Sequence, residues 1–426
     1  MRKMKDSGIE WVGQIPKDWD VVPHKRVMHK VKKICEQYSG EDIISLTMNG
    51  VIKRDLTAGG KMPTSFDGYQ YVKPNDLLLC LFDIDVTPRC VGVVKDYGVT
   101  SPAYSRFVMH DGYYNAYYDY LLRAIDDDKV FVHLSKNLRS SLTESDFGAI
   151  KTCVPSLAEQ KRIVTFLDAQ CAEIDAVSEK TRASIEEYKK LKQAVITQAV
   201  TKGIRGDRPM KDSGIEWIGE IPAEWNKDKV IRVFSVIGSG TTPKSSDENL
   251  FDGNTPWIQS GDINGENLFV TKNCVSNSAI ESYSALRVYQ APYLVVAMYG
   301  ASVGNLSLSM IDACVNQACC VLKKPTINLK FSFYIFKAVK DYLARKAVGG
   351  GQPNISQETI KQLWLPIPSA DEQIEISNYL DEKCRSVDAL IAKKQQYLTE
   401  IETYKKSLIY EYVTGKKEVK TSVLAD

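Results

Sequence analysis

MKDSGIEWVGQIPKDW (residues 4–19) is repeated as MKDSGIEWIGEIPAEW (residues 210–225), with 12 of the 16 positions identical. A second repeated pair follows, VPSLAEQKRIVTFLDAQCAEID at 154–175 and IPSADEQIEISNYLDEKCRSVD at 367–388. The long stretches between these pieces hardly resemble each other. A frame that is repeated around dissimilar contents predicts two equivalent structural positions, each holding a different binding surface.

The second pair predicts two long helices. Residues 142–201 align with residues 355–414 without a gap. One inserted residue would rotate every later side chain of a helix by about 100°, so a continuous helix is the structure that forbids gaps. Each segment starts after Pro-Ser, with Glu159 or Glu372 in the first turn, and ends before Gly203 or Gly415.

Along both segments, side chains at alternating spacings of three and four residues predict a heptad seam. Its expected apolar positions are Ile174, Val177, Tyr188, Leu191, Val195, Val387, Leu390, Tyr397, Ile401, Tyr404 and Leu408. We expect the two helices to pack on each other through this seam. The alternative is that each is an ordinary amphipathic helix packed on its own domain. From residue 174 to 195 the seam spans about 32 Å, close to the roughly 34–36 Å of one turn of B-DNA.

The two dissimilar stretches read as strand-rich with interspersed helices. Their loops, above all in the second stretch, carry side chains that hydrogen-bond base edges or phosphates, although each loop alone could be a solvated turn. The candidate contacts in the second stretch are Thr241, Thr242, Lys244, Gln259, Ser260, Asn305, Gln317, Gln352 and Asn354. Those in the first stretch are Asn49, Lys53, Arg54, Lys61, Lys136 and Arg139.

Composition and motifs argue against catalysis and membrane insertion. The net charge is only +2, which is neutral evidence because nucleic-acid footprints are local. No apolar run approaches the roughly 20 residues of a membrane span. Ten cysteines without a C-x-x-C pair are typical of a reducing cytoplasm. Because no phosphate loop, dinucleotide fingerprint or catalytic triad pattern is present, we expect a cytoplasmic, non-catalytic chain with no metal or cofactor of its own.

Several motifs taken together resemble those of the DNA-specificity (S) subunits of type I restriction–modification systems, the HsdS family, over essentially the full chain. They are SGIEWVGQIP and SGIEWIGEIP, GSGTTP (238–243), PWIQSGDIN (256–264), MYGASVG (298–304), NQACC (316–320), GGQPNIS (350–356), and the paired PSLAEQKRIVTFLD and PSADEQIEISNYLD. The first stretch lacks the G-x-T-P and G-D-I-N motifs of the second. We therefore expect its recognition domain to be of a different subtype.

The resemblance implies an α+β fold of two mixed α/β target-recognition domains in a pseudo-two-fold arrangement, joined by two long antiparallel coiled-coil-like helices. The implied segments are 1–20 (N-terminal segment), 21–153 (first recognition domain), 154–206 (first spacer helix), 207–225 (linker repeat), 226–366 (second recognition domain), 367–416 (second spacer helix) and 417–426 (tail).

By the same resemblance, each domain reads one half of a bipartite, asymmetric target in double-stranded DNA. The helices set the spacer and dock two modification (methyltransferase) subunits, and restriction (helicase–nuclease) subunits join the complex. S-adenosylmethionine, ATP and Mg²⁺ are implied for those partners and not for this chain. The alternative function is a non-catalytic protein-interaction scaffold without DNA sequence preference.

Overall fold

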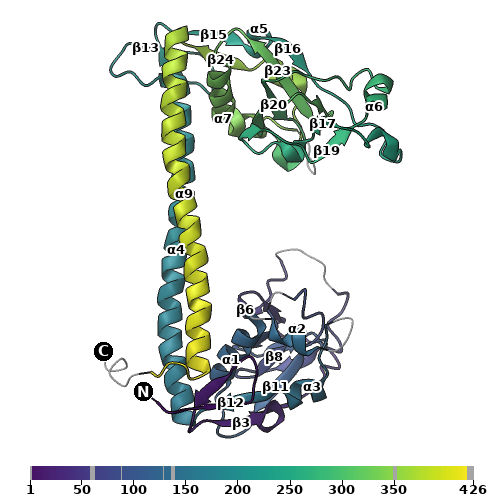
Figure 1. Cartoon of the computed structure of the whole chain (residues 1–426), viewed down its shortest axis with the longest axis vertical. Helices are drawn as coiled ribbons and strands as arrows, with labels where there is room; N and C mark the ends of the chain where they lie inside the picture. The colour runs from purple at the N-terminus through teal and green to yellow at the C-terminus, as the bar shows by residue number, and fades with distance from the viewer. Residues whose placement is uncertain are drawn as a thin grey trace. The chain divides into compact units, whose positions relative to one another are not determined.

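The computed structural model describes residues 2–57, 63–87, 89–127, 129–135, 140–348 and 353–419. The chain divides into two units, one made of Met1–Thr181 and Gln396–Asp426, the other of Arg182–Gln395. The division cuts both long helices, α4 (Leu157–Lys202) and α9 (Ala370–Val413). Each unit therefore contains one half of α4 and one half of α9, packed side by side (Figure 1).

Both long helices begin and end as the sequence predicts. Ser156 Oγ accepts a hydrogen bond from the backbone N–H of Glu159, and Ser369 Oγ accepts one from Glu372. These bonds satisfy amide groups that the first turn of a helix leaves without partners. At the other end, Gly203 and Gly415 adopt φ values of 75° and 71°. A Cβ at Gly415 would lie 2.4 Å from Pro16 Cδ, so close packing also requires glycine there.

The two variable domains contain antiparallel sheets with the same strand order. In the first unit the order is β4-β11-β8-β9, formed by Met28–Lys30, Ser105–Met109, Leu77–Leu79 and Val91–Val93. In the second it is β16-β23-β20-β21, formed by Phe234–Gly238, Cys319–Pro325, Tyr293–Ala297 and Leu306–Ser309. A fifth strand, β18 (Asn267–Leu268), pairs in parallel with β21. One topology therefore recurs beneath two sequences that hardly resemble each other.

The elements around the sheets also recur. Both units have a hairpin from the repeated stretch, a ribbon joining the ends of the domain, and a helix between sheet and long helices. In the first unit these are β1 (Met4–Asp6) with β2 (Gln14–Pro16), β3 (Asp20–Pro23) with β12 (Lys151–Val154), and α1 (Asn115–Asp127). In the second they are β13 (Met210–Asp212) with β14 (Glu220–Pro222), β15 (Asn226–Lys229) with β24 (Trp364–Ile367), and α7 (Leu329–Arg345).

Two more pairs of elements are equivalent, because α3 (Glu144–Ala149) aligns in the repeat with α8 (Gln357–Lys361), and the 3-10 helix His24–Arg26 follows β3 as α5 (Val230–Val233) follows β15. The other elements differ between the units. The first domain adds β5 (Ile44–Thr47), β6 (Gly50–Lys53), β7 (Gln70–Val72), β10 (Gly98–Thr100) and α2 (Val130–Leu134). The second adds β17 (Thr255–Ile258), β19 (Asn273–Val275), β22 (Cys314–Val315), α6 (Asn277–Ser282) and the 3-10 helices Glu248–Leu250, Ser260–Asp262 and Gly300–Ser302.

The first unit is built from both ends of the chain. Tyr410 Oη on α9 donates a hydrogen bond to the carbonyl of Trp11, and Lys416 Nζ donates to that of Val12. Tyr117 Oη on α1 donates to the carbonyl of Val413. The N-terminal hairpin and the first variable domain therefore pack on the last turns of the last helix. Among the described residues, no helix has the length and apolarity that a membrane span requires.

Candidate functional site

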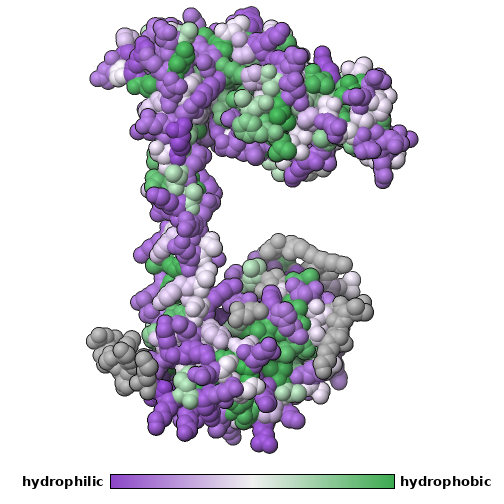
Figure 2. Space-filling view, in the orientation of Figure 1, coloured by the Kyte–Doolittle hydropathy of each residue, from purple (hydrophilic) through white to green (hydrophobic). Residues whose placement is uncertain are grey.

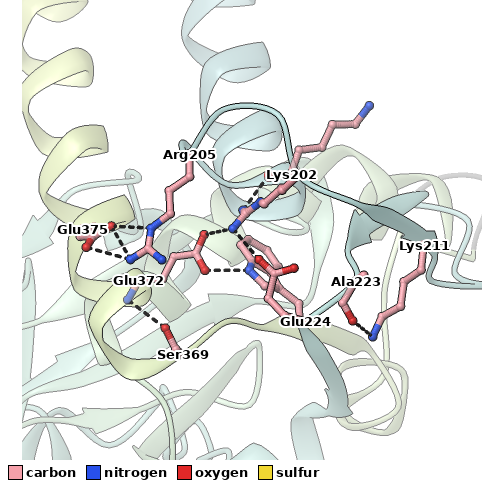
Figure 3. A network of polar contacts seen from close by, with 10 residues as sticks. Lys202, Arg205, Lys211, Ala223, Glu224, Ser369, Glu372 and Glu375 are labelled. Atoms are coloured by element: carbon pink, nitrogen blue, oxygen red, sulfur yellow. Dashed lines mark hydrogen bonds and ion pairs between the residues drawn. The ribbon is translucent and has the colours of Figure 1, made fainter.

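A buried cluster ties the repeated stretch of the second unit to the start of α9. Glu372 accepts a hydrogen bond of 2.9 Å from Trp225 Nε1 and forms an ion pair of 2.6 Å with Arg208. Arg208 also pairs with Glu224 at 3.0 Å and lies over the Trp225 ring. Figure 3 shows the Glu372 carboxylate in this network, one turn of helix from Glu375.

The first unit contains the same cluster. Glu159 at the start of α4 accepts a hydrogen bond of 3.0 Å from Trp19 Nε1 and pairs with Arg2. Arg2 also pairs with Asp18 at 2.6 Å and lies over the Trp19 ring. Each Trp and each Glu belongs to the repeated motifs, so this Arg–Trp–Glu cluster explains why those motifs are needed in both copies.

The glutamines that follow these glutamates connect each long helix to its variable domain. Gln160 donates a hydrogen bond of 2.9 Å to the carbonyl of Pro155, and its side-chain oxygen accepts one of 2.8 Å from Tyr114 N, just before α1. Gln373 bonds in the same way to the carbonyl five residues before it, and accepts 2.6 Å from Asn328 N, just before α7. The Glu-Gln dipeptide of the repeat therefore fixes the helix, the repeated stretch and the domain to one another within each unit.

A tyrosine of each variable domain also contacts its long helix. Tyr120 Oη donates to Asp168 at 2.7 Å, and Tyr334 Oη donates to Asp381 at 2.6 Å. Burial, and to a smaller extent the hydrogen bond to the carboxylate, raises the pKa of both hydroxyls well above the usual range. Both hydroxyls therefore remain protonated donors over the whole physiological pH range.

The halves of α4 and α9 pack antiparallel in each unit. In the first unit Lys405 pairs with Asp175 at 2.6 Å, and in the second Lys192 pairs with Asp388 at 2.5 Å. These pairs are equivalent, because Asp175 aligns with Asp388 and Lys192 with Lys405 in the repeat. The Tyr188 ring lies beneath Lys394 in the second unit. Helices packed only on their own domains would make none of these contacts.

The contact face of the two helices corrects the phase of the expected seam. Six expected positions do face the partner helix and are buried or half-buried, namely Ile174, Tyr188, Val195, Val387, Ile401 and Leu408. The other five are exposed, namely Val177, Leu191, Leu390, Tyr397 and Tyr404. One residue after each of these five lies the true seam position, namely Ser178, Lys192, Ile391, Leu398 and Lys405. Because polar side chains occupy three of these five positions, hydrophobicity alone favoured the neighbouring residue.

In each unit the exposed residues form a short apolar stripe beside the seam, with Val177, Tyr397 and Tyr404 in the first unit and Leu191 and Leu390 in the second. Val177 aligns with Leu390 in the repeat, and Leu191 aligns with Tyr404. Each of these residues directly precedes a seam position, and such positions flank one side of an antiparallel helix pair. Asp168, which binds the variable domain, follows a seam position and flanks the other side. The stripe therefore lies away from the variable domain in each unit, and Figure 2 shows apolar side chains exposed along the helices.

In the second domain, the structure gathers the described candidate contacts at one edge. They lie on loops that follow β16, β17, β20 and β22, and on the segment that returns before α8. Thr242 Oγ1 donates to Gln317 Oε1 at 2.5 Å, and Gln259 Oε1 accepts from Asn273 at 3.0 Å. The carbonyl of Asn305 accepts from Ala297 N at 2.8 Å. A Cβ at Gly240 would lie 1.7 Å from the carbonyl of Val315, so this glycine allows two of the loops to touch.

The remaining candidates of that domain are placed as follows. Thr241 and Ser260 are half-buried on the same loops, and Lys244 and Asn354 are exposed. The backbone of Asn354 pairs with that of Tyr299 in the loop after β20. Gln352 lies outside the described residues. This polar edge, defined by the loops 239–244, 259–260, 299–305, 316–318 and 353–355, is rich in amide and hydroxyl groups that can bond base edges.

The first domain does not gather a comparable set among its described residues. Asn49 is exposed at the turn between β5 and β6. Lys53, on the same hairpin, pairs with Asp42 at 2.7 Å, and Arg54 is half-buried. Lys61, Lys136 and Arg139 lie outside the described residues. In the parts of the chain that the structure describes, no group of three or more His, Cys, Asp or Glu side chains is placed to hold a metal ion.

Comparisons with known proteins agree with this architecture. A family model for the type I restriction modification DNA specificity domain matches residues 222–402. The putative type I restriction enzyme MjaX specificity subunit of Methanocaldococcus jannaschii is 23% identical over 96% of both chains. The MjaVIII specificity subunit of the same organism is 25% identical over 64% of both chains.

Two solved structures share the fold. One comes from work on complex assembly and conformational transition of the type I R-M system, with a TM-score of 0.72 at 15% identity, covering 95% of this chain and 99% of that one. The other is the HsdS subunit from Thermoanaerobacter tengcongensis, with a TM-score of 0.51 at 15% identity, covering 95% and 98%.

Proposed function

Since this chain belongs to the HsdS family of type I restriction–modification specificity subunits, we propose that its two variable domains each read one half of a bipartite, asymmetric DNA target. The chain is a non-catalytic member of its system. The cleaving and methylating subunits would bind S-adenosylmethionine, ATP and Mg²⁺. We expect the chain to act in the cytoplasm together with those subunits.

The observation that carries this proposal is the shared strand order beneath dissimilar loops. The sheet orders β4-β11-β8-β9 and β16-β23-β20-β21 agree, whereas the loops between these strands differ in length and composition. A conserved scaffold presents each loop set in an equivalent place, and loops are where binding specificity resides. Two different loop sets would read two different half-sequences, so the whole target would be asymmetric.

Within the second domain, the polar edge supports a division of roles. Thr242, Gln317, Gln259 and Asn354 offer amides and hydroxyls for base edges, whereas the exposed Lys244 offers a cation for a phosphate. Changing Lys244 to Ala should therefore weaken binding to all sequences alike and lower the slope of log K against log salt by about 0.9. A titration that gives an unchanged salt slope would remove Lys244 from the interface.

We assign the spacing of the half-sites to the paired helices. Inserting seven residues after Ala183 and seven after Gln396, which are equivalent positions, keeps the heptad phase of both helices. It lengthens each by about 10.5 Å, or roughly three base pairs of B-DNA. The methylated target should keep its half-sites and gain about three base pairs of spacer. Insertion into one helix alone, which breaks the register of the ion pairs, serves as the control and should abolish methylation.

The apolar stripe supports docking of two modification subunits. Val177 with Tyr404 in the first unit, and Leu390 with Leu191 in the second, are equivalent apolar side chains, and in each unit they lie on the side of the helices away from the variable domain. Two equivalent surfaces fit two copies of one partner, and exposed apolar patches of this kind are typical of protein interfaces. Restriction subunits would join through the assembled modification subunits.

The test that separates this function from a scaffold is selection on random DNA. The full chain, assembled with its modification subunits, is incubated with a pool of random duplexes, and bound duplexes are amplified and sequenced. We expect enrichment of two unlike half-sequences at a fixed separation. Unchanged base frequencies after repeated rounds would leave the protein-interaction scaffold as the better description.

A further inference from the structure

One exposed aromatic ring follows the same strand of the sheet in both variable domains. Phe82 lies in the loop after β8, and its surface is 38% exposed. Tyr299 lies in the loop after β20, and its surface is 44% exposed. β8 and β20 occupy equivalent places in the shared strand order. Neither ring belongs to the core of its domain, so packing does not explain its presence.

The backbone around Tyr299 is fixed by the segment that returns before α8. The carbonyl of Met298 accepts a hydrogen bond of 2.9 Å from Ile355 N, and Gly300 N donates one of 2.9 Å to the carbonyl of Pro353. Tyr299 is thus held between two bonds to one neighbouring segment. Tyr299 therefore has an anchored backbone at the polar edge, where it pairs with Asn354, and its side chain is exposed.

The first domain holds Phe82 in a similar way, with one more residue between the two bonded groups. The carbonyl of Leu81 accepts a hydrogen bond of 2.8 Å from Leu142 N, and Ile84 N donates one of 3.1 Å to the carbonyl of Ser140. Residues 140 and 142 align in the repeat with residues 353 and 355, the two that hold Tyr299. The bonds to the next strand agree as well: Cys80 N donates to the carbonyl of Cys90 in the first domain, and Ala297 N donates to the carbonyl of Asn305 in the second. Phe82 and Tyr299 are therefore structurally equivalent.

The equivalence of Phe82 and Tyr299 is informative because the two loops that carry them differ in length and in nearly all other residues. The segment after β8 reads CLFDIDVTPRC and that after β20 reads MYGASVGN, yet both present an aromatic ring on a braced backbone. A planar ring can stack on a base, contact a thymine methyl group or wedge into a base step, with little rotamer entropy to lose. An aliphatic residue or a buried aromatic would serve none of these contacts equally well.

We propose that Phe82 and Tyr299 are the DNA-contacting aromatics of the first and second domains, one for each half-site. The proposal rests on the proposed function, since it names residues with which the two domains grip DNA. Each ring contributes apolar contact with a base or sugar, while the neighbouring polar groups supply the hydrogen bonds. The two rings act independently, because each belongs to its own domain.

The test uses two variants and two matched controls. Phe82→Ala and Tyr299→Ala remove the rings, whereas Tyr97→Ala and Phe269→Ala remove rings that are 57% and 66% exposed in the same two domains. Tyr97 follows β9, which is antiparallel to β8. Phe269 follows β18, whose Leu268 is paired with Ser309 at the far end of β21. Both control rings therefore lie at the opposite edge of the sheet from the proposed contacts.

Each variant, assembled with its modification subunits, is titrated against the selected duplex and against duplexes with one half-site scrambled. Phe82→Ala and Tyr299→Ala should each weaken binding to the intact target by about tenfold, as loss of one stacked base contact does. Scrambling the half-site of the altered domain should then cost less than it costs the wild type. Tyr299→Phe keeps the ring and should bind nearly as tightly as the wild type, and both controls should stay within about twofold.

Three results would overturn the proposal. Equal losses from Tyr299→Ala and Phe269→Ala would show a general effect of removing exposed rings. A lower yield of the assembled complex, with unchanged DNA affinity of the complex that does form, would assign the rings to a protein interface. If the wild-type complex binds DNA without any sequence preference, the proposed function itself is wrong, and the assignment of the rings to half-sites is wrong with it.

Discussion

The cluster at the start of α9 gives a sharp prediction about stability. Glu372 is almost fully buried, with its side chain 3% exposed, and its partner Arg208 is 12% exposed. Changing Glu372 to Gln keeps the shape and an acceptor for Trp225 Nε1 but removes the charge. Arg208 then has Glu224, whose side chain is 55% exposed, as its remaining charged partner, beside the carbonyl of Lys202. Loss of one partner of a buried pair costs about 3–5 kcal/mol, and the retained amide should reduce this to about 2–4 kcal/mol.

The same helix supplies a matched control. Glu375 makes a two-pronged pair with Arg205 at 2.9 and 3.1 Å, but the side chains are 48% and 51% exposed. Because exposed pairs contribute little, Glu375→Gln should cost less than about 0.5 kcal/mol. Urea unfolding of the full chain measures both losses, and hydrogen exchange shows where each occurs. We expect the loss of protection in Glu372→Gln to fall within Arg182–Gln395.

Equal destabilisation by the two substitutions would refute the reasoning, because it would mean that burial does not set the strength of these pairs. Glu159→Gln makes the equivalent change in the first unit and should destabilise that unit instead. If it lowered protection in the second unit to the same degree, the two clusters would not be the separate anchors described above.

Three further predictions concern the seam and the first domain. In thermal unfolding, Ile391→Ala should lower the stability by about 2–4 kcal/mol and Leu390→Ala by less than about 1 kcal/mol, because only Ile391 is buried against α4. Leu390→Asp should leave the fold intact but reduce co-purification of a modification subunit. Burial lowers the pKa of His24 to about 4, below its unfolded value near 6.5, so the unfolded chain binds the proton first. Stability of the first unit should therefore fall by up to about 3 kcal/mol between pH 6.5 and pH 4, and calorimetry of His24→Gln should show a weaker dependence. Asp76→Asn leaves the buried Arg106 without its charged partner and should cost about 3–5 kcal/mol by urea unfolding.

Much of the frame could be predicted from the sequence because its constraints are local and repeated. The gap-free alignment predicts both long helices. Their starts are marked by Ser156 and Ser369, and their ends by Gly203 and Gly415. The seam was placed one residue too early at alternate positions, since the sequence offers apolar residues such as Leu191 directly before polar seam positions. At two of those positions, Lys192 and Lys405 form antiparallel ion pairs with Asp388 and Asp175.

The variable domains were harder to predict, for a physical reason. Strand order depends on contacts between residues distant in the chain, such as Leu79 with Ser105 or Ala297 with Cys319, and single-sequence patterns do not reveal such pairing. The loops of the second domain could still be found by composition. Tyr299 cannot be identified from the sequence, because a lone tyrosine in a loop carries no signal until the structure places Phe82 at the equivalent position.

The distribution of each unit along the chain has a consequence for synthesis. The second unit is one continuous segment, Arg182–Gln395, so all of its residues have been synthesised before the last helix is finished. The first unit needs Tyr410, Val413 and Lys416 to cover its hairpin and α1. During synthesis the first unit therefore cannot complete its packing until residues 410–416 have been made. The variable domain that is synthesised first belongs to the unit that is completed last.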